Sequence, residues 1–164
     1  MIEGSFATLD RLGHGMARGL LQIYGDAGAY LGQGMCGGRI SLFGSAGVYA
    51  GANMRGGTLQ VAANVGDFLG AALPGDPAGM EEGTVLVGGD AGDRVGDRMR
   101  RGLIAVRGRL GDYAASRMIG GTIVTRHGCG ADPGFAMRRR SLLLGRTPDH
   151  LLATYTNNGS QELP

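Results

Sequence analysis

Seven internal methionines divide this chain at nearly constant intervals. The intervals are 19, 19, 26, 19, 19 and 19 residues, so one 7-residue insertion interrupts an otherwise regular 19-residue period. A fixed period is the signature of a repeat protein, in which each unit buries its apolar face against its neighbours. The methionines that mark the repeat are Met16, Met35, Met54, Met80, Met99, Met118 and Met137.

Glycines follow the same period. The chain has 34 glycines among 164 residues, and one row of them lies three residues after the methionines. Glycine at a fixed place in each unit is typical of a tight corner that requires a positive φ. We expect the flexible methionine side chains to fill gaps in the core beside these corners. The row comprises Gly19, Gly38, Gly57, Gly83, Gly102 and Gly121, with Arg140 in the seventh unit.

Alternating apolar and variable residues follow each of these glycines. This pattern predicts a short β-strand with one buried face in every unit. Helical and propeller-blade repeats are longer than 19 residues, so the chain is predicted to be all-β, a single-stranded β-helix (solenoid) of about seven 19-residue coils. The inward rows are Leu21, Ile40, Leu59, Val85, Ile104, Ile123 and Leu142, then Ile23, Leu42, Val61, Val87, Val106, Thr125 and Leu144. Between them lie Gln22, Ser41, Gln60, Leu86, Ala105, Val124 and Leu143.

Two segments depart from the repeat. The solenoid is predicted to span residues 1–145, with an insertion loop at 73–79, and residues 146–164 form a cap or a tail that docks on a partner. The loop holds prolines and glycines, which indicate a surface turn. It is either a docking element or a neutral decoration. The residues we expect to contact a partner are Leu73, Pro74, Asp76, Pro77, Arg138, Arg139 and Arg140.

Composition limits the functional classes. The net charge of +2 does not favour nucleic acid, and an aromatic content of 5% without tryptophan leaves few rings for stacking on bases. The charge is uneven: residues 1–88 carry four arginines and seven acids (−3), whereas residues 89–164 carry twelve arginines and seven acids (+5). No apolar run approaches the length of a membrane span, and no secretion leader is recognisable. We expect a cytoplasmic protein that contacts neither membrane nor nucleic acid.

Residues able to carry chemistry are few. The histidines are too scattered for a metal site, and no catalytic or metal-binding set is predicted. Cys129 shares a row with small apolar residues and is interpreted as a buried filler, although a Cys129–His127 pair remains an alternative nucleophile. His14 is interpreted as part of a variable surface row. A further group is interpreted as a solvated face that pairs with arginines across coils: Asp90, Asp93, Asp97 and Asp112.

The repeat G-x-x-G-x-x-x-G-x-x-M-x-x-G resembles the GXGXG domain, the right-handed β-helix of the glutamate synthase large subunit. Three stretches more closely resemble the C-type subunit of formylmethanofuran dehydrogenase, in particular its bacterial counterpart in the formyltransferase/hydrolase complex. They are GDFLGAALPG at 66–75, DRMRRGLI at 97–104 and PGFAMRRRSLLL at 133–144. The resemblance covers about residues 1–155 and implies a right-handed solenoid.

This resemblance also implies a function. Members of the family are scaffold subunits of a complex that transfers a formyl group from formyl-tetrahydromethanopterin to a methanofuran-like carrier and releases formate. The implied partners are amidohydrolase-like, dehydrogenase-B-like and formyltransferase subunits. No cofactor is expected on this chain itself, and no catalytic residue of the family maps onto it. The alternative is a glutamate-synthase-like GXGXG structural module that couples other enzyme subunits.

Overall fold

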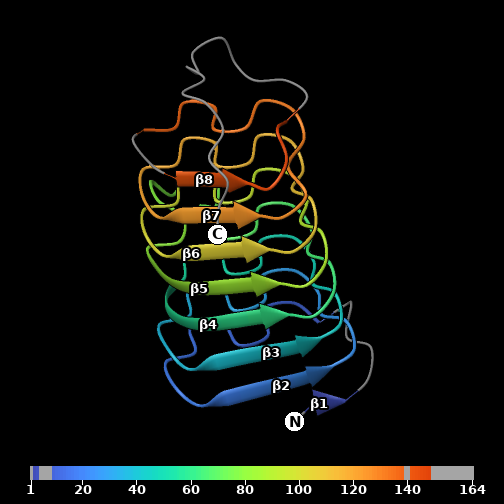
Figure 1. The fold of residues 1–164 in the computed structure, drawn as a ribbon. Helices are drawn as coiled ribbons and strands as arrows, with labels where there is room; N and C mark the ends of the chain where they lie inside the picture. The colour runs from blue at the N-terminus through green and yellow to red at the C-terminus, as the bar shows by residue number, and fades with distance from the viewer. Residues whose placement is uncertain (1, 4–8, 139–140, 149–164) are drawn as a thin grey trace.

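A computed structural model describes residues 2–3, 9–138 and 141–148 (Figure 1). These residues form one parallel sheet in which the strands follow each other in chain order, and they contain no helix, hence none that could cross a membrane. The all-β prediction is therefore confirmed. The strands are β1 (Ile2–Glu3), β2 (Leu20–Tyr24), β3 (Arg39–Phe43), β4 (Arg55–Val61), β5 (Glu82–Val87), β6 (Leu103–Val106), β7 (Thr122–Thr125) and β8 (Ser141–Leu144).

The strands stack in the register that the 19-residue period predicts. Leu21 pairs with Ile40 and Ile40 pairs with Leu59, so each inward row continues from coil to coil. Strands β2–β8 supply one strand for each of the seven predicted coils, and Figure 1 shows the chain climbing from β2 to β8 as a right-handed solenoid. The repeat did not predict β1, which pairs with β2 through Ile2 and Ile23.

The core runs through the middle of the coils as continuous rows of side chains. The two inward strand rows are buried from β3 to β7, including the hydroxyl-bearing Thr125. At the last strand, Leu142 and Leu144 are only partly buried, because no further described coil covers them. The internal methionines join the same core. They are fully buried in the five central coils and partly buried at Met16 and Met137.

A second row of pairing lies three or four residues beyond the end of each strand from β2 to β7. It consists of isolated parallel bridges in one row: Ala27, Ala46, Val65, Ala91, Leu110 and Cys129. These side chains are buried, and the backbone N–H groups around them donate to carbonyls of adjacent coils. Backbone hydrogen bonds at other corners, such as Cys36 N–H to the Met16 carbonyl at 2.8 Å, add further lines, so each coil is held to its neighbours at several places around its circumference.

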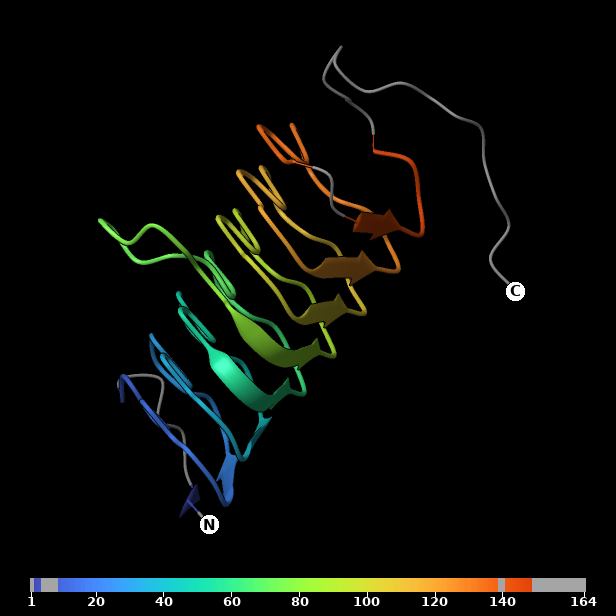
Figure 2. The ribbon, with the colours of Figure 1, turned by 90° about the vertical axis from the view of Figure 1, so that its left-hand side faces the viewer.

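The insertion projects from the solenoid between the coils of β4 and β5. Figure 2 shows it as a green loop that extends farther than the corners above and below it, on the side opposite the strands. The insertion changes the spacing of β4 and β5 to 26 residues from Thr58 to Val61, where Leu59 pairs with Val85. Nearer the start of β4 the register shifts by one residue, since Arg55 pairs with Glu82. The predicted C-terminal cap falls mainly on 149–164, which lie outside the described residues.

Candidate docking surfaces

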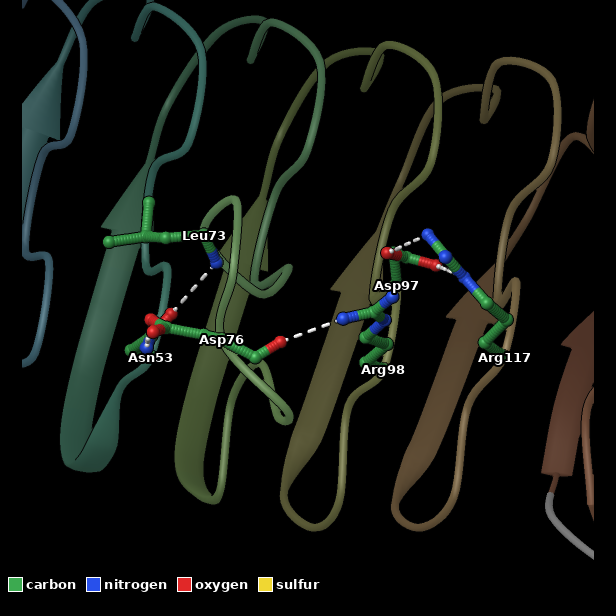
Figure 3. A network of polar contacts seen from close by, with 6 residues as sticks. All are labelled: Asn53, Leu73, Asp76, Asp97, Arg98 and Arg117. Carbon is green, nitrogen blue, oxygen red and sulfur yellow. Dashed lines mark hydrogen bonds and ion pairs between the residues drawn. The ribbon is translucent and has the colours of Figure 1, made fainter.

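The insertion loop is fixed from the coil below it by Asn53. The side-chain oxygen Oδ1 of Asn53 accepts a hydrogen bond from the backbone N–H of Leu73 at 3.3 Å. Its amide nitrogen Nδ2 donates to the carboxylate of Asp76 (Figure 3). A turn inside the loop, in which the Asp76 N–H donates to the Leu73 carbonyl at 2.9 Å, keeps both groups facing Asn53. The loop therefore has a defined shape.

Arg98 holds the same loop from the coil above. Its guanidinium Nη1 donates to the backbone carbonyl of Asp76 at 2.8 Å. At the base of the loop, Ala72 N–H donates to the Asp97 carbonyl at 3.1 Å and Gly79 N–H donates to the Arg98 carbonyl at 3.0 Å. The exposed surface that this arrangement offers to a partner consists of Pro74, Gly75 and Pro77.

A buried carboxylate lies next to the loop. Asp97 is 4% exposed and forms a two-pronged ion pair with Arg117 of the next coil, at 2.9 Å to Nε and 2.7 Å to Nη2 (Figure 3). The interpretation of Asp97 as an exposed acid is therefore wrong. His14 itself is exposed, as expected, but its row is not a surface row throughout, since Ala52, Ala71, Asp97 and Ser116 are buried.

The other acidic residues of this region, Asp90, Asp93 and Asp112, are exposed, as predicted for a solvated face. The ion pairs expected for them across coils are not formed with any arginine among the described residues. Asp90 Oδ1 accepts from the backbone N–H of Arg109, and Asp93 Oδ1 accepts from that of Asp112, both at 2.8 Å. Asp112 Oδ1 accepts in turn from Ala131 N–H at 2.7 Å. These carboxylates satisfy amide groups of the next coil, so their role is structural.

A row of rings and guanidinium groups lies on one corner of the solenoid, and sequence reasoning missed it. The rings of Tyr30, Tyr49 and Phe68 stack in successive coils, with centroids 5.4 and 4.6 Å apart, and Arg11 lies over Tyr30. These residues recur with the 19-residue period, but the row is not uniform in residue type, because some coils have arginine or aspartate at this position. The full row is Arg11, Tyr30, Tyr49, Phe68, Arg94, Tyr113 and Asp132.

The outward face of the sheet carries a hollow. It has a volume of about 690 Å³ and lies over strands β4 to β8. Its lining is mainly apolar and includes Leu86, which is 37% exposed, and Leu143, which is 43% exposed. Arg107 and Arg126 lie at the rim, immediately after β6 and β7.

The candidate nucleophiles are not assembled into a reactive site. Cys129 is buried, and burial raises the pKa of its thiol, only partly opposed by Arg109. A raised pKa lowers the thiolate fraction and with it the reactivity of the sulfur. His127 is exposed, and its backbone N–H donates to the hydroxyl of Thr125 at 3.3 Å. The described residues hold no cluster of metal-ligating side chains.

The residues predicted to contact a partner fall in two places. One group lies in the insertion loop, between β4 and β5, and consists of Leu73, Pro74, Asp76 and Pro77. Arg138 is exposed in the seventh coil, shortly before β8. Arg139 and Arg140 lie outside the described residues. Of the arginine group, the structure therefore places only Arg138, which precedes β8 and is separate from the loop.

Comparison with solved structures shows what this chain is similar to. No protein-family model and no curated protein matches this chain. A chain of the X-ray crystal structure of the formyltransferase/hydrolase complex (FhcABCD) from Methylorubrum extorquens in complex with methylofuran does match. The two chains share 42% sequence identity and superimpose with a TM-score of 0.89. The match covers 98% of this chain and 60% of that chain. Over nearly its whole length, this protein is thus similar to a chain of a formyltransferase/hydrolase complex.

Proposed function

We propose that this chain is a non-catalytic scaffold subunit of a formyltransferase/hydrolase complex in one-carbon metabolism. The observation that supports it is the 42% identity over 98% of the chain with a chain of such a complex. A TM-score of 0.89 at this identity relates the two chains in sequence as well as in fold. The three stretches that carry the family resemblance include the insertion loop, which the general repeat alone does not require.

In this proposal the chemistry takes place on other subunits. The complex transfers a formyl group from formyl-tetrahydromethanopterin to a methanofuran-like carrier, and water then cleaves the formyl–carrier bond to release formate. The partners are an amidohydrolase-like, a dehydrogenase-B-like and a formyltransferase subunit. The solenoid contributes a rigid body, because several lines of inter-coil backbone hydrogen bonds fix each coil against the next.

The insertion loop is the proposed contact with a neighbouring subunit. A docking element has to keep its shape before the partner arrives, since ordering a loop on binding costs affinity. Bonds to Asn53 and Arg98 from the two flanking coils provide that shape. Arg138, with Arg139 and Arg140, is proposed as a separate contact near the end of the solenoid.

Affinity purification of the tagged native chain, followed by mass spectrometry, tests the proposal. We expect the three partner subunits to copurify, the intact complex to release formate from the formylated carrier, and the isolated chain to release none. Within the complex, the loop at 73–79 is expected to resist a protease that cuts it in the isolated chain. Copurification of a flavin-dependent synthase, or hydrolysis by the isolated chain, would contradict the proposal.

A further inference from the structure

The outward face of the sheet changes character at the insertion. In β2–β4 the middle outward residue is polar, whereas in β5–β8 it is apolar. The first three are Gln22, Ser41 and Gln60; the last four are Leu86, Ala105, Val124 and Leu143. All seven occupy one row, because the strands pair in register. We call the last four residues the apolar strip. The fold is the same in both halves, so it does not explain the change.

The apolar strip lies in a hollow that a protein surface could fill. Small residues at Ala62, Gly88 and Ala105 leave space beside the larger Leu86 and Leu143, and the hollow measures about 690 Å³. A parallel sheet is ordinarily covered on both faces, and a contiguous exposed apolar patch with a polar rim marks an interaction site. In β2–β4 the polar residues are confined to the middle row, since Leu20, Tyr24 and Phe43 at the strand ends are also exposed on this face.

The rim of the hollow favours an acidic partner. Arg107 and Arg126 follow β6 and β7 in adjacent coils, both exposed, and the structure gives their side chains no hydrogen bond or ion pair with any described residue. A second copy of this chain, docked on the same face about a two-fold axis parallel to the strands, would bring these guanidinium groups toward their own copies. Like charges placed opposite each other disfavour such a contact.

We propose that the apolar strip docks a partner subunit that presents an apolar ridge flanked by carboxylates, which pair with Arg107 and Arg126. This inference rests on the proposed function in one respect, namely that the chain is a subunit of a hetero-oligomer. It adds a surface that is distinct from the insertion loop, since the loop projects on the side opposite the strands (Figure 2).

The test replaces residues of the apolar strip by residue types that the chain itself has in the same row of the polar half, β2–β4. Leu86→Gln reproduces Gln60, and Val124→Ser reproduces Ser41, so the coil is expected to accept both. The affinity of the double variant for the copurified partner subunits is measured by titration. We expect it to fall at least about tenfold, because two side chains lose apolar burial. The control exchanges Gln22→Ser and Ser41→Gln in the polar half and is expected to change affinity less than about twofold.

The charge contribution is measured separately. Arg107→Gln with Arg126→Gln is expected to slow association at low salt and to reduce its salt dependence, whereas Arg39→Gln on the polar half leaves both unchanged. Unchanged affinity of the Leu86/Val124 variant, with wild-type partners still copurifying, overturns the docking surface and leaves the proposed function standing. Failure of the wild-type chain to copurify any partner instead contradicts the proposed function.

Two other occupants of the hollow give distinct results. If light scattering shows a dimer of the isolated chain that Leu86→Gln with Val124→Ser dissociates, a second copy occupies the strip. If the double variant and a chain ending at residue 148 lose equal stability, and the combination loses no more, this chain's own C-terminal segment occupies it. Either result overturns the proposal.

Discussion

At the scale of single residues, the direction of the Cβ atom decides which corner positions have to be glycine. Four rows adopt a left-handed backbone, and several of these positions are not glycine, among them Tyr49, Asn53 and Arg117. At Gly57, with φ +80°, an added Cβ would lie 2.8 Å from the backbone of Gly37 and Gly38, whereas at Gly34, with φ +64°, it would meet nothing within 4 Å.

This difference gives a matched pair of substitutions. Gly34→Ala is expected to lower the free energy of unfolding by about 1–2 kcal/mol, from the left-handed backbone alone. Gly57→Ala carries the same strain and adds a backbone clash, which costs a further amount of about 1–3 kcal/mol. Urea unfolding of the two variants measures the difference. Equal losses would show that backbone conformation alone accounts for the glycine row.

At the scale of elements, the insertion loop depends on side chains from coils that flank it. Asn53 supplies two of the bonds, and it does so from a left-handed conformation at φ +53° that asparagine and glycine tolerate well. The coil that holds the loop therefore does not determine the loop's shape alone. A substitution in a neighbouring coil is therefore expected to alter the shape of the loop.

Removing this side chain without adding strain isolates its effect. Asn53→Gly is expected to speed proteolytic cleavage within 73–79 by roughly tenfold, because two hydrogen bonds are lost, each contributing about 0.5–1.5 kcal/mol. Mass spectrometry of timed digests gives the rate. Asn64→Gly is the control: it removes a side-chain bond to the Asp90 N–H, which also spans the insertion but lies away from the loop. Equal acceleration in both variants would argue against a specific anchor.

Strand positions, register and inward rows could be predicted because each depends on a strict period that the sequence displays. The environments of Asp97 and of the His14 row could not. They lie at corners where left-handed residues break the alternation of inward and outward side chains, so neighbours in sequence give no indication of burial. Likewise, nearby arginines suggested ion pairs for Asp90 and Asp93. The stacking of the coils instead places a backbone N–H of the next coil within hydrogen-bonding distance of each carboxylate.

At the scale of the whole molecule, each strand contacts only its neighbours in the sequence. Stability in such a solenoid is a sum over coils and the interfaces between them, and a residue's contribution depends on how many coils cover it. Leu59 is fully buried between β3 and β5, whereas Leu142, in the same row, has only β7 as a described neighbour and is partly buried. The row therefore contains one leucine packed between two neighbouring coils and one leucine packed against a single described coil.

Truncating both leucines measures the effect of that cover. Leu59→Ala is expected to lower the free energy of unfolding by about 2–5 kcal/mol, as in other cores, and Leu142→Ala by less than about 2 kcal/mol. Chemical unfolding at equal protein concentration makes the comparison, and the milder Leu→Val pair serves if Leu59→Ala does not fold. A loss at Leu142 equal to that at Leu59 would mean that further residues cover the last coil.

The base of the insertion has an evolutionary consequence. The loop leaves the coil at Ala72 and returns at Gly79, where each backbone N–H bonds to a carbonyl of the same neighbouring pair, Asp97 and Arg98. Met80 N–H also bonds back to the Gly70 carbonyl at 2.9 Å. Segments of different length and sequence can therefore be exchanged between these closed ends by insertion or deletion in the gene while the coils stay intact. Lineages could diversify what this subunit recognises at one site, with selection on the rest of the chain acting mainly to preserve the repeat.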